Sequence, residues 1–352
     1  MKTEQPVIVI LSPGFPKDEA DSTCLPAVQN FVKALNMQFP LVKVIVLAFD
    51  YPYISASYQW HGNTVTAFNG LKKRKLRKVF KWISIWQKLN EMKRKNNIIG
   101  LLSFWCGECA YIGNRYAKKN RLNHYCWIMG QDAKKENSYA GRIKARPNEL
   151  IAISDFIQTT FKKNHNIQPQ YVIPLGINAD KFTNGETTRY IDILGAGSLI
   201  PLKQFDIFLD VVAGIKKEFA DVNVILAGDG PEKEKLRSLI AASGLQKNVS
   251  LAGELPYHEV LALMQRTKIL LHPSSYEGFS GVCLEALYAG AHVISFCRAM
   301  NDNIDDWHIV HSKKEMKVKA LELLQKSGTS YKSVMPFLIG DTVKKVMKLF
   351  RT

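Results

Sequence analysis

The sequence lacks the features of membrane-spanning, exported and disordered proteins. None of its apolar runs reaches the length of about 18 residues that a helix needs to cross a bilayer. Its first residues, MKTEQPVIVILSPGF, hold only the short apolar run 7–11, so we expect no signal peptide and a cytoplasmic location. No low-complexity tract indicates disorder. Because 352 residues exceed what one hydrophobic core commonly supports, we expect two domains.

Cysteine is scarce, and no metal-binding pattern of Cys or His residues is evident. The six cysteines fit a reduced compartment. Cys106 and Cys109, in FWCGEC, resemble a thioredoxin redox motif, but they lie between a buried strand and a helix of a much larger array, and we interpret them as core residues. No Asp-x-Asp motif stands between strands. The sequence therefore predicts chemistry that needs no metal.

Acidic residues are few in the first half of the chain. Residues 1–178 hold 26 Lys and Arg against 11 Asp and Glu, whereas residues 179–352 hold 22 against 20. The positive charge is concentrated in 71–95, LKKRKLRKVFKWISIWQKLNEMKRK, which has 11 basic residues and one acidic residue. This imbalance predicts an anionic partner for the N-terminal half.

The basic segment 71–95 is expected to be a long amphipathic helix. Apolar residues recur at three and four positions and predict one broad face: Leu76, Val79, Phe80, Trp82, Ile83, Ile85, Trp86, Leu89 and Met92. A basic helix with tryptophans is typical of an anionic membrane surface, but an ordinary surface helix with its apolar face in the core fits equally. No nucleic-acid-binding module accompanies it, so no nucleic acid is expected as a partner.

Alternating apolar runs and helical patterns predict an α/β protein. Continuous apolar runs indicate strands buried on both faces, hence parallel sheets. The expected strands are 7–11, 42–49, 98–104, 124–129, 150–154, 170–175, 191–196, 223–228, 249–253, 269–273 and 292–296. The expected helices are 24–39, 71–95, 109–120, 203–219, 231–243, 257–266, 281–289, 313–326 and 340–351. Residues 50–70 are expected to form an irregular loop. Two doubly wound Rossmann-like domains follow, with a linker at 176–189 and the ligand site in the cleft between them.

The stretch 274–295, SSYEGFSGVCLEALYAGAHVIS, places two glutamates around a predicted helix start. Glu277 and Glu285 are separated by seven residues, with Gly278 and Gly281 between them. Free amides at a helix start hold phosphate, and glycines let a ligand approach the backbone. Carboxylates accept hydrogen bonds from sugar hydroxyls, and a buried carboxylate is costly unless it is paired or bound to a ligand. We therefore expect a nucleotide sugar, with its ribose at Glu285 and its transferred sugar at Glu277.

The same stretch resembles the E-x7-E motif of retaining glycosyltransferases of family 4, which have the GT-B fold. Other stretches match motifs of that family in the same order. They are IPLGIN (173–178), GAGSLIPLKQFD (195–206), LAGDGPEKEKL (226–236) and VSLAGELPYHEV (249–260). The resemblance covers residues 150–295 well and the N-terminal half more loosely.

The resemblance implies a role for each matching residue. Glu277, Lys203 and Asp132 would be catalytic, with Lys203 neutralising the departing diphosphate. The implied donor-binding residues are Gly14, Gly197, Ser198, Lys203, Gly228, Gly230, Gly278, Phe279, Ser280, Gly281, Val282 and Glu285. His61 and Gln131 are candidates for acceptor contact. The chain departs from the family where Ser198 replaces a common arginine, and where Gln131 and Asp132 stand in a loop that commonly holds a histidine.

The resemblance also implies the domain organisation and the reaction. Residues 1–178, joined by a returning C-terminal helix at about 336–352, would form an acceptor-binding, membrane-facing domain, and 179–335 a donor-binding domain. The implied activity moves a sugar from a nucleotide-diphosphate sugar to a cell-surface glycan or lipid-linked acceptor, without cofactor or metal, at the inner face of the membrane. A nucleotide-sugar epimerase of the same fold, a non-catalytic basic adaptor and, less favoured, a Rossmann dehydrogenase are the alternatives.

Overall fold

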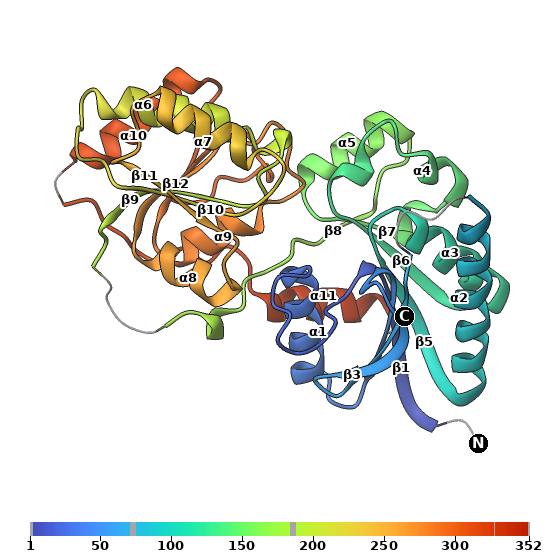
Figure 1. Ribbon diagram of the computed structural model, residues 1–352. Helices are drawn as coiled ribbons and strands as arrows, with labels where there is room; N and C mark the ends of the chain where they lie inside the picture. Colours follow the sequence, from blue (N-terminus) through green and yellow to red (C-terminus); the bar gives the residue numbers. More distant parts are fainter. Residues whose placement is uncertain (1–2, 71–74, 184–187, 327, 351–352) are drawn as a thin grey trace. The chain divides into compact units, whose positions relative to one another are not determined.

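The computed structural model describes residues 3–70, 75–183, 188–326 and 328–350 of the chain. These residues divide into two compact units, residues 1–175 with 339–352, and residues 176–338 (Figure 1). Four residues of the predicted basic helix, 71–74, and four of the predicted linker, 184–187, lie outside the described residues. Within the described part of the chain, no helix is both long and apolar enough to cross a membrane.

The described strands of the first unit form one eight-stranded sheet. They pair in parallel except for β3 and β4, which are antiparallel. Their order across the sheet is β3 (Ser55–Trp60), β4 (Asn63–Phe68), β2 (Lys43–Tyr51), β1 (Thr3–Gly14), β5 (Asn96–Phe104), β6 (Asn123–Ile128), β7 (Leu150–Ala152) and β8 (Tyr171–Val172). The helices are α1 (Pro26–Gln38), α2 (Lys75–Lys95), α3 (Glu108–Asn120), α4 (Ser138–Ile143), α5 (Asp155–His165) and α11 (Ile339–Leu349).

The C-terminal helix α11 belongs to the first unit, as predicted. Its apolar residues Val343, Val346 and Met347 are buried. The Tyr125 hydroxyl on β6 donates to the Leu349 carbonyl oxygen at 2.7 Å. α11 packs beside α1, and α2 and α3 cover the opposite face of the sheet. One continuous unit is therefore built from both ends of the chain.

The prediction of an irregular loop at 50–70 is wrong. β3 and β4 form a hairpin whose two-residue turn is His61 and Gly62, with φ of 43° and 77°. Two positive φ values match the twist of a tight hairpin, and glycine takes that conformation without steric cost. The strands pair Ser55 with Phe68 through Trp60 with Asn63. The many aromatic residues in 50–70 made the alternation of the two strands hard to recognise in the sequence.

The prediction of one broad apolar face on α2 is wrong in part. Ile85, Leu89 and Met92 are buried in the core of the first unit, and Trp82 and Trp86 pack against it. Val79, Phe80 and Ile83 instead point outward, with exposed fractions of 50%, 68% and 48%. Lys81, on the inner side, is held by ion pairs to Asp50 at 2.8 Å and to Glu108 at 2.9 Å. The side of the helix that faces the sheet therefore combines a buried apolar patch with one paired cation.

The cysteines of the FWCGEC segment behave as core residues. Cys106 and Cys109 are buried and free, at 1% and 4% exposure. Burial raises the pKa of the Cys109 thiol well above its ordinary value. A protonated, inaccessible thiol is a poor nucleophile, which agrees with rejecting a redox role.

The described strands of the second unit form a six-stranded parallel sheet. Their order is β11 (Val249–Gly253), β10 (Val224–Ala227), β9 (Ile191–Ala196), β12 (Thr267–His272), β13 (His292–Ser295) and β14 (Trp307–Ile309). The helices are α6 (Phe205–Lys216), α7 (Lys233–Ala242), α8 (Tyr257–Gln265), α9 (Gly281–Tyr288) and α10 (Lys313–Gln325). The edge strand β14 and, in the first unit, α4 and α5 were not predicted.

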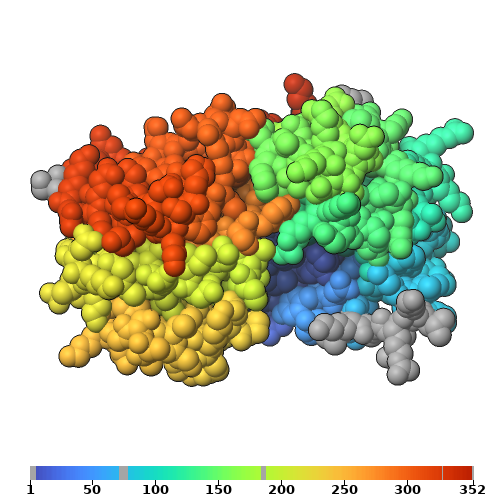
Figure 2. All heavy atoms as spheres, turned by 90° about the horizontal axis from the view of Figure 1, so that it is seen from above, coloured from blue at the N-terminus to red at the C-terminus, as the bar shows by residue number. Residues whose placement is uncertain are grey.

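Helices cover both faces of this second sheet. One core packs residues of α6, α7 and α10 against alternate residues of the central strands, and the other packs residues of α8 and α9 against the remaining ones. α10 lies beside α6 on the surface (Figure 2). Because the strands are buried on both faces, their sequences are continuously apolar, which is why they could be predicted.

Candidate functional site

The order of the strands in the second unit reverses between β9 and β12. From β9 the chain proceeds to β10 and β11 on one side, and then to β12, β13 and β14 on the other. Loops leaving the carboxyl ends of β9 and β12 therefore diverge, and such switch points bind ligands in open α/β sheets. The loop after β9 carries Lys203, and the loop after β12 carries Glu277. The two predicted catalytic residues of this unit thus flank one switch point.

Lys203 and Glu277 are in direct contact. The Lys203 ammonium pairs with Oε1 of Glu277, and the two side chains are only 18% and 16% exposed. His272, at the end of β12, donates from Nε2 to the same carboxylate oxygen at 3.0 Å. Ser280 Oγ lies 3.3 Å from that ring nitrogen. Sequence reasoning missed His272; its one signal was a histidine that ends an otherwise apolar strand, ILLHP.

The environment of Glu277 keeps its carboxylate ionised. Burial alone raises its pKa, but the hydrogen bond from His272 and the charge of Lys203 outweigh burial and lower the pKa to about 2. His272 is buried, and burial lowers its pKa despite the neighbouring carboxylate. A neutral imidazole therefore donates to an ionised Glu277 at neutral pH. The site holds one fixed negative charge and one fixed positive charge.

The helix start predicted near Ser280 is confirmed. Ser280 caps α9, and Gly281 is its first residue. Gly281 is exposed, and a Cβ atom built on it would meet no other atom within 4 Å. The backbone amide of Ser275 donates to the Leu202 carbonyl oxygen at 3.0 Å, so the loop leading to α9 is held against the turn that carries Lys203. An open helix start with its free amides thus belongs to the same switch point.

Glu285 lies one turn into α9 and pairs with a residue from another motif. The Tyr257 hydroxyl, at the start of α8, donates to Glu285 Oε1 at 2.7 Å. Burial raises the pKa of Glu285 to about 7, and the hydrogen bond from Tyr257 only moderates that increase. This carboxyl group is therefore about half protonated at neutral pH. It can both donate and accept hydrogen bonds there.

The predicted donor-binding glycines Gly228 and Gly230 have a packing role in the structure. Both have positive φ, 142° and 157°. A Cβ atom on Gly228 would collide with the Gly197 carbonyl oxygen, and one on Gly230 would lie 2.5 Å from the Leu199 carbonyl oxygen. The Leu199 amide donates to the Asp229 carbonyl oxygen at 2.9 Å. These glycines let the turns after β9 and β10 pack against each other.

Other predicted donor-binding residues differ in how accessible they are. Phe279 is 8% exposed and packs on the rings of Trp307 and Phe337, so its side chain is directed into the unit. Gly278 is buried as well, and Val282 is partly buried. Ser198, which stands in place of the family's arginine, is exposed beside Gly197. Ser198 and Gly281 are therefore the fully exposed members of the predicted donor set. Its partly exposed members are Gly197, Lys203, Gly228, Gly230, Val282 and Glu285.

Asp132, a predicted catalytic residue of the first unit, is bonded to backbone amides. Its carboxylate accepts hydrogen bonds from the amides of Cys106 at 2.6 Å, Gly130 at 2.7 Å and Met129 at 3.1 Å. Burial raises its pKa, and these hydrogen bonds oppose that increase. The contacts join the loops that follow β5 and β6. The structure thus gives Asp132 a loop-organising role that the sequence did not indicate.

The remaining predicted residues of the first unit are Gly14, Gln131 and His61. Gly14 ends β1 and is buried, whereas Gln131 is exposed in the turn beside Asp132. His61 lies in the turn before β4, at the edge where the parallel strands begin, and its amide donates to Glu19 at 2.8 Å. His61 therefore contacts the loop that follows Gly14.

Comparison with known proteins finds a family model that resembles the second unit. Residues 177–327 match the family described as Glycosyl transferases group 1. A 2-deoxystreptamine N-acetyl-D-glucosaminyltransferase of Niallia circulans is 29% identical over 178 residues, 51% of this chain and 43% of the relative. The phosphatidylinositol N-acetylglucosaminyltransferase GPI3 subunit of Saccharomyces cerevisiae is 33% identical over 150 residues, 40% of this chain and 33% of the relative. The matches span half or less of these relatives.

Solved structures match the chain over nearly its full length. A glycosyltransferase from Rickettsia africae aligns with a TM-score of 0.73 at 13% identity, covering 99% of this chain and 98% of that one. The pneumococcal O-GlcNAc transferase GtfA, in complex with UDP and GlcNAc, aligns with a TM-score of 0.69 at 13% identity, covering 99% of each chain. At such low identity these matches establish the fold, which is the GT-B fold of two Rossmann-like parallel-sheet domains.

Proposed function

We propose that the protein is a retaining glycosyltransferase that moves a sugar from a nucleotide-diphosphate sugar to a lipid-linked or cell-surface glycan. The contact of Lys203 with Glu277 at the β9–β12 switch point carries this proposal. It lies inside residues 177–327, which match the glycosyltransferase family. An opposed pair of charges beside an open helix start suits a ligand that has both a diphosphate and a polyol.

Each group at the switch point has a chemical task in the proposed reaction. Lys203 and the amides of Gly281 and Val282 bind the diphosphate and stabilise its charge as the glycosidic bond breaks. Glu277 then accepts hydrogen bonds from the transferred sugar, and Glu285 from the ribose. The acceptor hydroxyl attacks from the face that the nucleotide leaves and passes its proton to the departing phosphate. Fixed protein charges take the place of a metal in this scheme.

The exposed side of α2 supports the proposal of a membrane-bound acceptor. Val79, Phe80 and Ile83 are apolar and at least 48% exposed. The sequence around them is basic, with five Lys and Arg in residues 71–77. Apolar residues next to cations suit the headgroup region of an anionic membrane, where each nearby cation contributes about 1 kcal/mol. The relative from Saccharomyces cerevisiae is named for a phosphatidylinositol acceptor.

A screen of donors followed by product analysis tests the proposed function. Solved relatives of this fold hold UDP with GlcNAc or UDP-glucose, so UDP-GlcNAc and UDP-glucose are the first donors to try, before GDP-, ADP- and dTDP-sugars. We expect one nucleotide sugar to raise the melting temperature and to transfer its sugar to a lipid-linked acceptor with retention at the anomeric carbon.

Two variants test the residue assignment. Lys203→Ala and Glu277→Ala should each lower transfer by at least about a hundredfold, because each removes a group that contacts the diphosphate or the sugar. Lys317→Ala is the control, since that lysine pairs only with Glu218 on the surface in the described contacts, at 3.0 Å. Unchanged transfer in both site variants would contradict the assignment. Epimerised sugar without transfer would favour an epimerase, and no response to any donor would favour a non-catalytic adaptor.

A further inference from the structure

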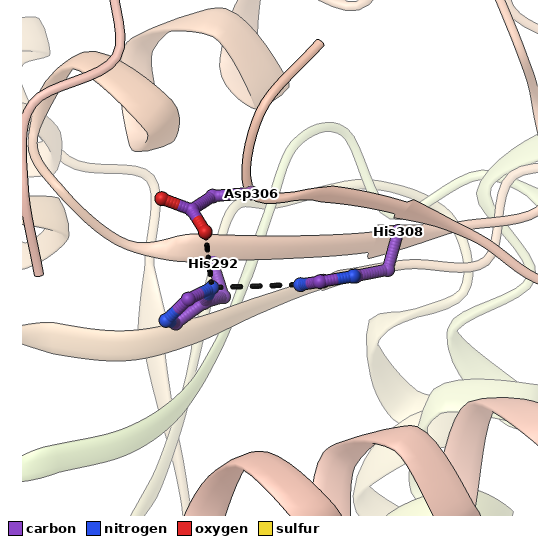
Figure 3. A group of neighbouring side chains, drawn as sticks. All are labelled: His292, Asp306 and His308. Atoms are coloured by element: carbon purple, nitrogen blue, oxygen red, sulfur yellow. Dashed lines mark hydrogen bonds and ion pairs between the residues drawn. The ribbon is translucent and has the colours of Figure 1, made fainter. Parts of the chain in front are cut away.

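Three potential metal ligands meet at the edge of the second sheet opposite the switch point. His292 is the first residue of β13, His308 is the middle residue of β14, and Asp306 immediately precedes β14 (Figure 3). Because these strands run parallel to β9 and β12, their amino ends lie at the edge away from Lys203 and Glu277. The group is therefore separate from the proposed donor site.

The strand register brings the two imidazoles to one face of the sheet. His308 pairs with Ile294, and side chains of residues 292 and 294 share a face because strands alternate. Nδ1 of His292 lies 3.1 Å from Oδ1 of Asp306 and 3.5 Å from Nε2 of His308. Figure 3 shows both contacts converging on that single nitrogen. All three ligand atoms lie within 4.8 Å of one another.

Hydrogen bonds alone cannot satisfy both contacts of the His292 ring nitrogen. A neutral imidazole has one N–H group, so Nδ1 of His292 can donate to Asp306 or to His308, but not to both. If Nδ1 carries no proton, its lone pair faces the Asp306 carboxylate. A single cation placed among the three atoms would accept electron pairs from all of them.

We propose that His292, Asp306 and His308 bind a divalent cation of the zinc class. Zinc binds nitrogen and oxygen ligands at about 2.0–2.2 Å, so two ligand atoms of a tetrahedral site lie about 3.3–3.6 Å apart. The separations of 3.1 and 3.5 Å are close to that edge, and the third pair of atoms, from Asp306 and His308, lies within 4.8 Å, so a small side-chain movement brings all three onto one cation. Asp306 is 33% exposed, so water can reach the fourth position. Two histidines and one carboxylate form a ligand set typical of zinc rather than of magnesium or calcium.

The neighbouring charges permit metal binding. Lys319, on the adjoining helix α10, is paired with Glu322 at 2.9 Å, which offsets its charge. An imidazole that carries its proton on one ring nitrogen can offer the lone pair of the other nitrogen to a cation.

A cation here would join the edge strand to the rest of its sheet. β14 has three residues and pairs with β13 alone in the described sheet. The segment 296–306 connects these strands, and Cys297 within it donates from Sγ to the Ser274 carbonyl oxygen at 3.1 Å. Binding therefore joins the two strands on either side of a segment that contacts the loop leading to α9. The expected effect is on stability, and it is independent of any reaction at the switch point.

Zinc content and affinity test the proposal directly. The full chain is dialysed against a chelator and titrated with Zn²⁺ in competition with a chromophoric chelator. We expect one zinc per chain, and an increase in melting temperature of about 5 °C or more when Zn²⁺ exceeds its Kd a hundredfold. Replacement by Co²⁺ should give a visible absorption band. A chain that binds no zinc at micromolar concentrations would overturn the proposal.

Two ligand variants and one control separate this site from adventitious binding. His308→Gln and Asp306→Asn should each weaken zinc binding by at least about tenfold. Asparagine suits position 306, because its φ of 57° is left-handed and asparagine tolerates that conformation. His311→Ala removes an exposed histidine nearby and should leave the Kd unchanged. Equal zinc affinity in both ligand variants and the wild type, or equal loss in His311→Ala, would refute the assignment.

Discussion

Replacing Glu277 by glutamine should strengthen the binding of a nucleoside diphosphate while it abolishes sugar transfer. In the structure the Lys203 ammonium is neutralised by Glu277. A diphosphate therefore competes with this carboxylate for the charge of Lys203 and is repelled by it. Glu277→Gln keeps the size and most hydrogen bonds of the side chain but removes its charge. The variant frees Lys203 in advance and removes the repulsion between a carboxylate and a phosphate.

The pKa of Glu277 sets the expected magnitude. A decrease from 4.5 to about 2 corresponds to about 3 kcal/mol of net stabilisation of the ionised form, at about 1.4 kcal/mol per pKa unit. This stabilisation is present above pH 4.5 and is lost as the pH falls towards 2. Because part of this stabilisation comes from Lys203, we expect the variant to bind the diphosphate with a Kd lower by roughly tenfold, which is about 1.4 kcal/mol.

Titration calorimetry with the nucleoside diphosphate measures this effect. The Kd should fall about tenfold in Glu277→Gln and rise in Lys203→Met. The control is Glu218→Gln, which breaks a surface ion pair with Lys317 and should leave the Kd unchanged. Transfer from the intact nucleotide sugar should be lost in Glu277→Gln, because the hexose loses its carboxylate partner. Weaker diphosphate binding in Glu277→Gln would refute the idea that this carboxylate occupies the lysine in the ligand-free protein.

Three further predictions concern a proton, a loop and a surface. Glu285 has its pKa raised to about 7, so its contribution to stability is complete below pH 4.5 and is lost as the pH rises through 7; Glu285→Gln should flatten this decline in urea unfolding between pH 5 and 8. Asp132→Asn should lower the free energy of unfolding by about 2 kcal/mol, because its NH₂ group cannot accept the hydrogen bonds that backbone amides donate to Asp132. A variant with full stability but a reduced kcat would indicate a catalytic role instead. The double variant Phe80→Ser with Ile83→Ser should bind anionic phosphatidylserine vesicles at least about tenfold more weakly, with unchanged stability, because both side chains are exposed. Leu41→Ser is the control, since Leu41 is 78% exposed but is not part of α2. Equal vesicle binding by all forms would contradict the membrane proposal.

Hydrophobic periodicity predicted the second unit to within a few residues. Residues 257–266 and 281–289 were expected to be helical, and the structure has α8 at Tyr257–Gln265 and α9 at Gly281–Tyr288. Strands buried on both faces appear as continuous apolar runs, whereas the helices between them have apolar residues at every third or fourth position. Because these two patterns differ clearly, each element could be assigned independently. The three-residue strand β14 was missed because its partly buried residues, Trp307 to Ile309, form too short a run to show a pattern.

Periodicity on α2 identified an apolar helix but not the side that the protein covers. Nine apolar positions around the helix allowed several orientations. In the structure the inner side includes Lys81, which pairs with Asp50 and Glu108, residues 31 and 27 positions away along the chain. Such long-range pairs leave no trace in a helical pattern. The exposed Val79, Phe80 and Ile83 therefore emerged from the structure alone.

Motif resemblance identified the loops of the candidate site but not the role of each residue in them. Gly228 matches a motif that suggests ligand contact, yet the backbone of Gly197 already fills the space beside it. Lys203 and Glu277 match motifs 74 residues apart, and only the meeting of β9 and β12 at the switch point brings them into contact. Since each neutralises the other, neither can be removed without changing its partner. The effects of the two substitutions on diphosphate binding should therefore be non-additive. The Kd of the double variant, compared with those of the two single variants, gives the interaction free energy between Lys203 and Glu277.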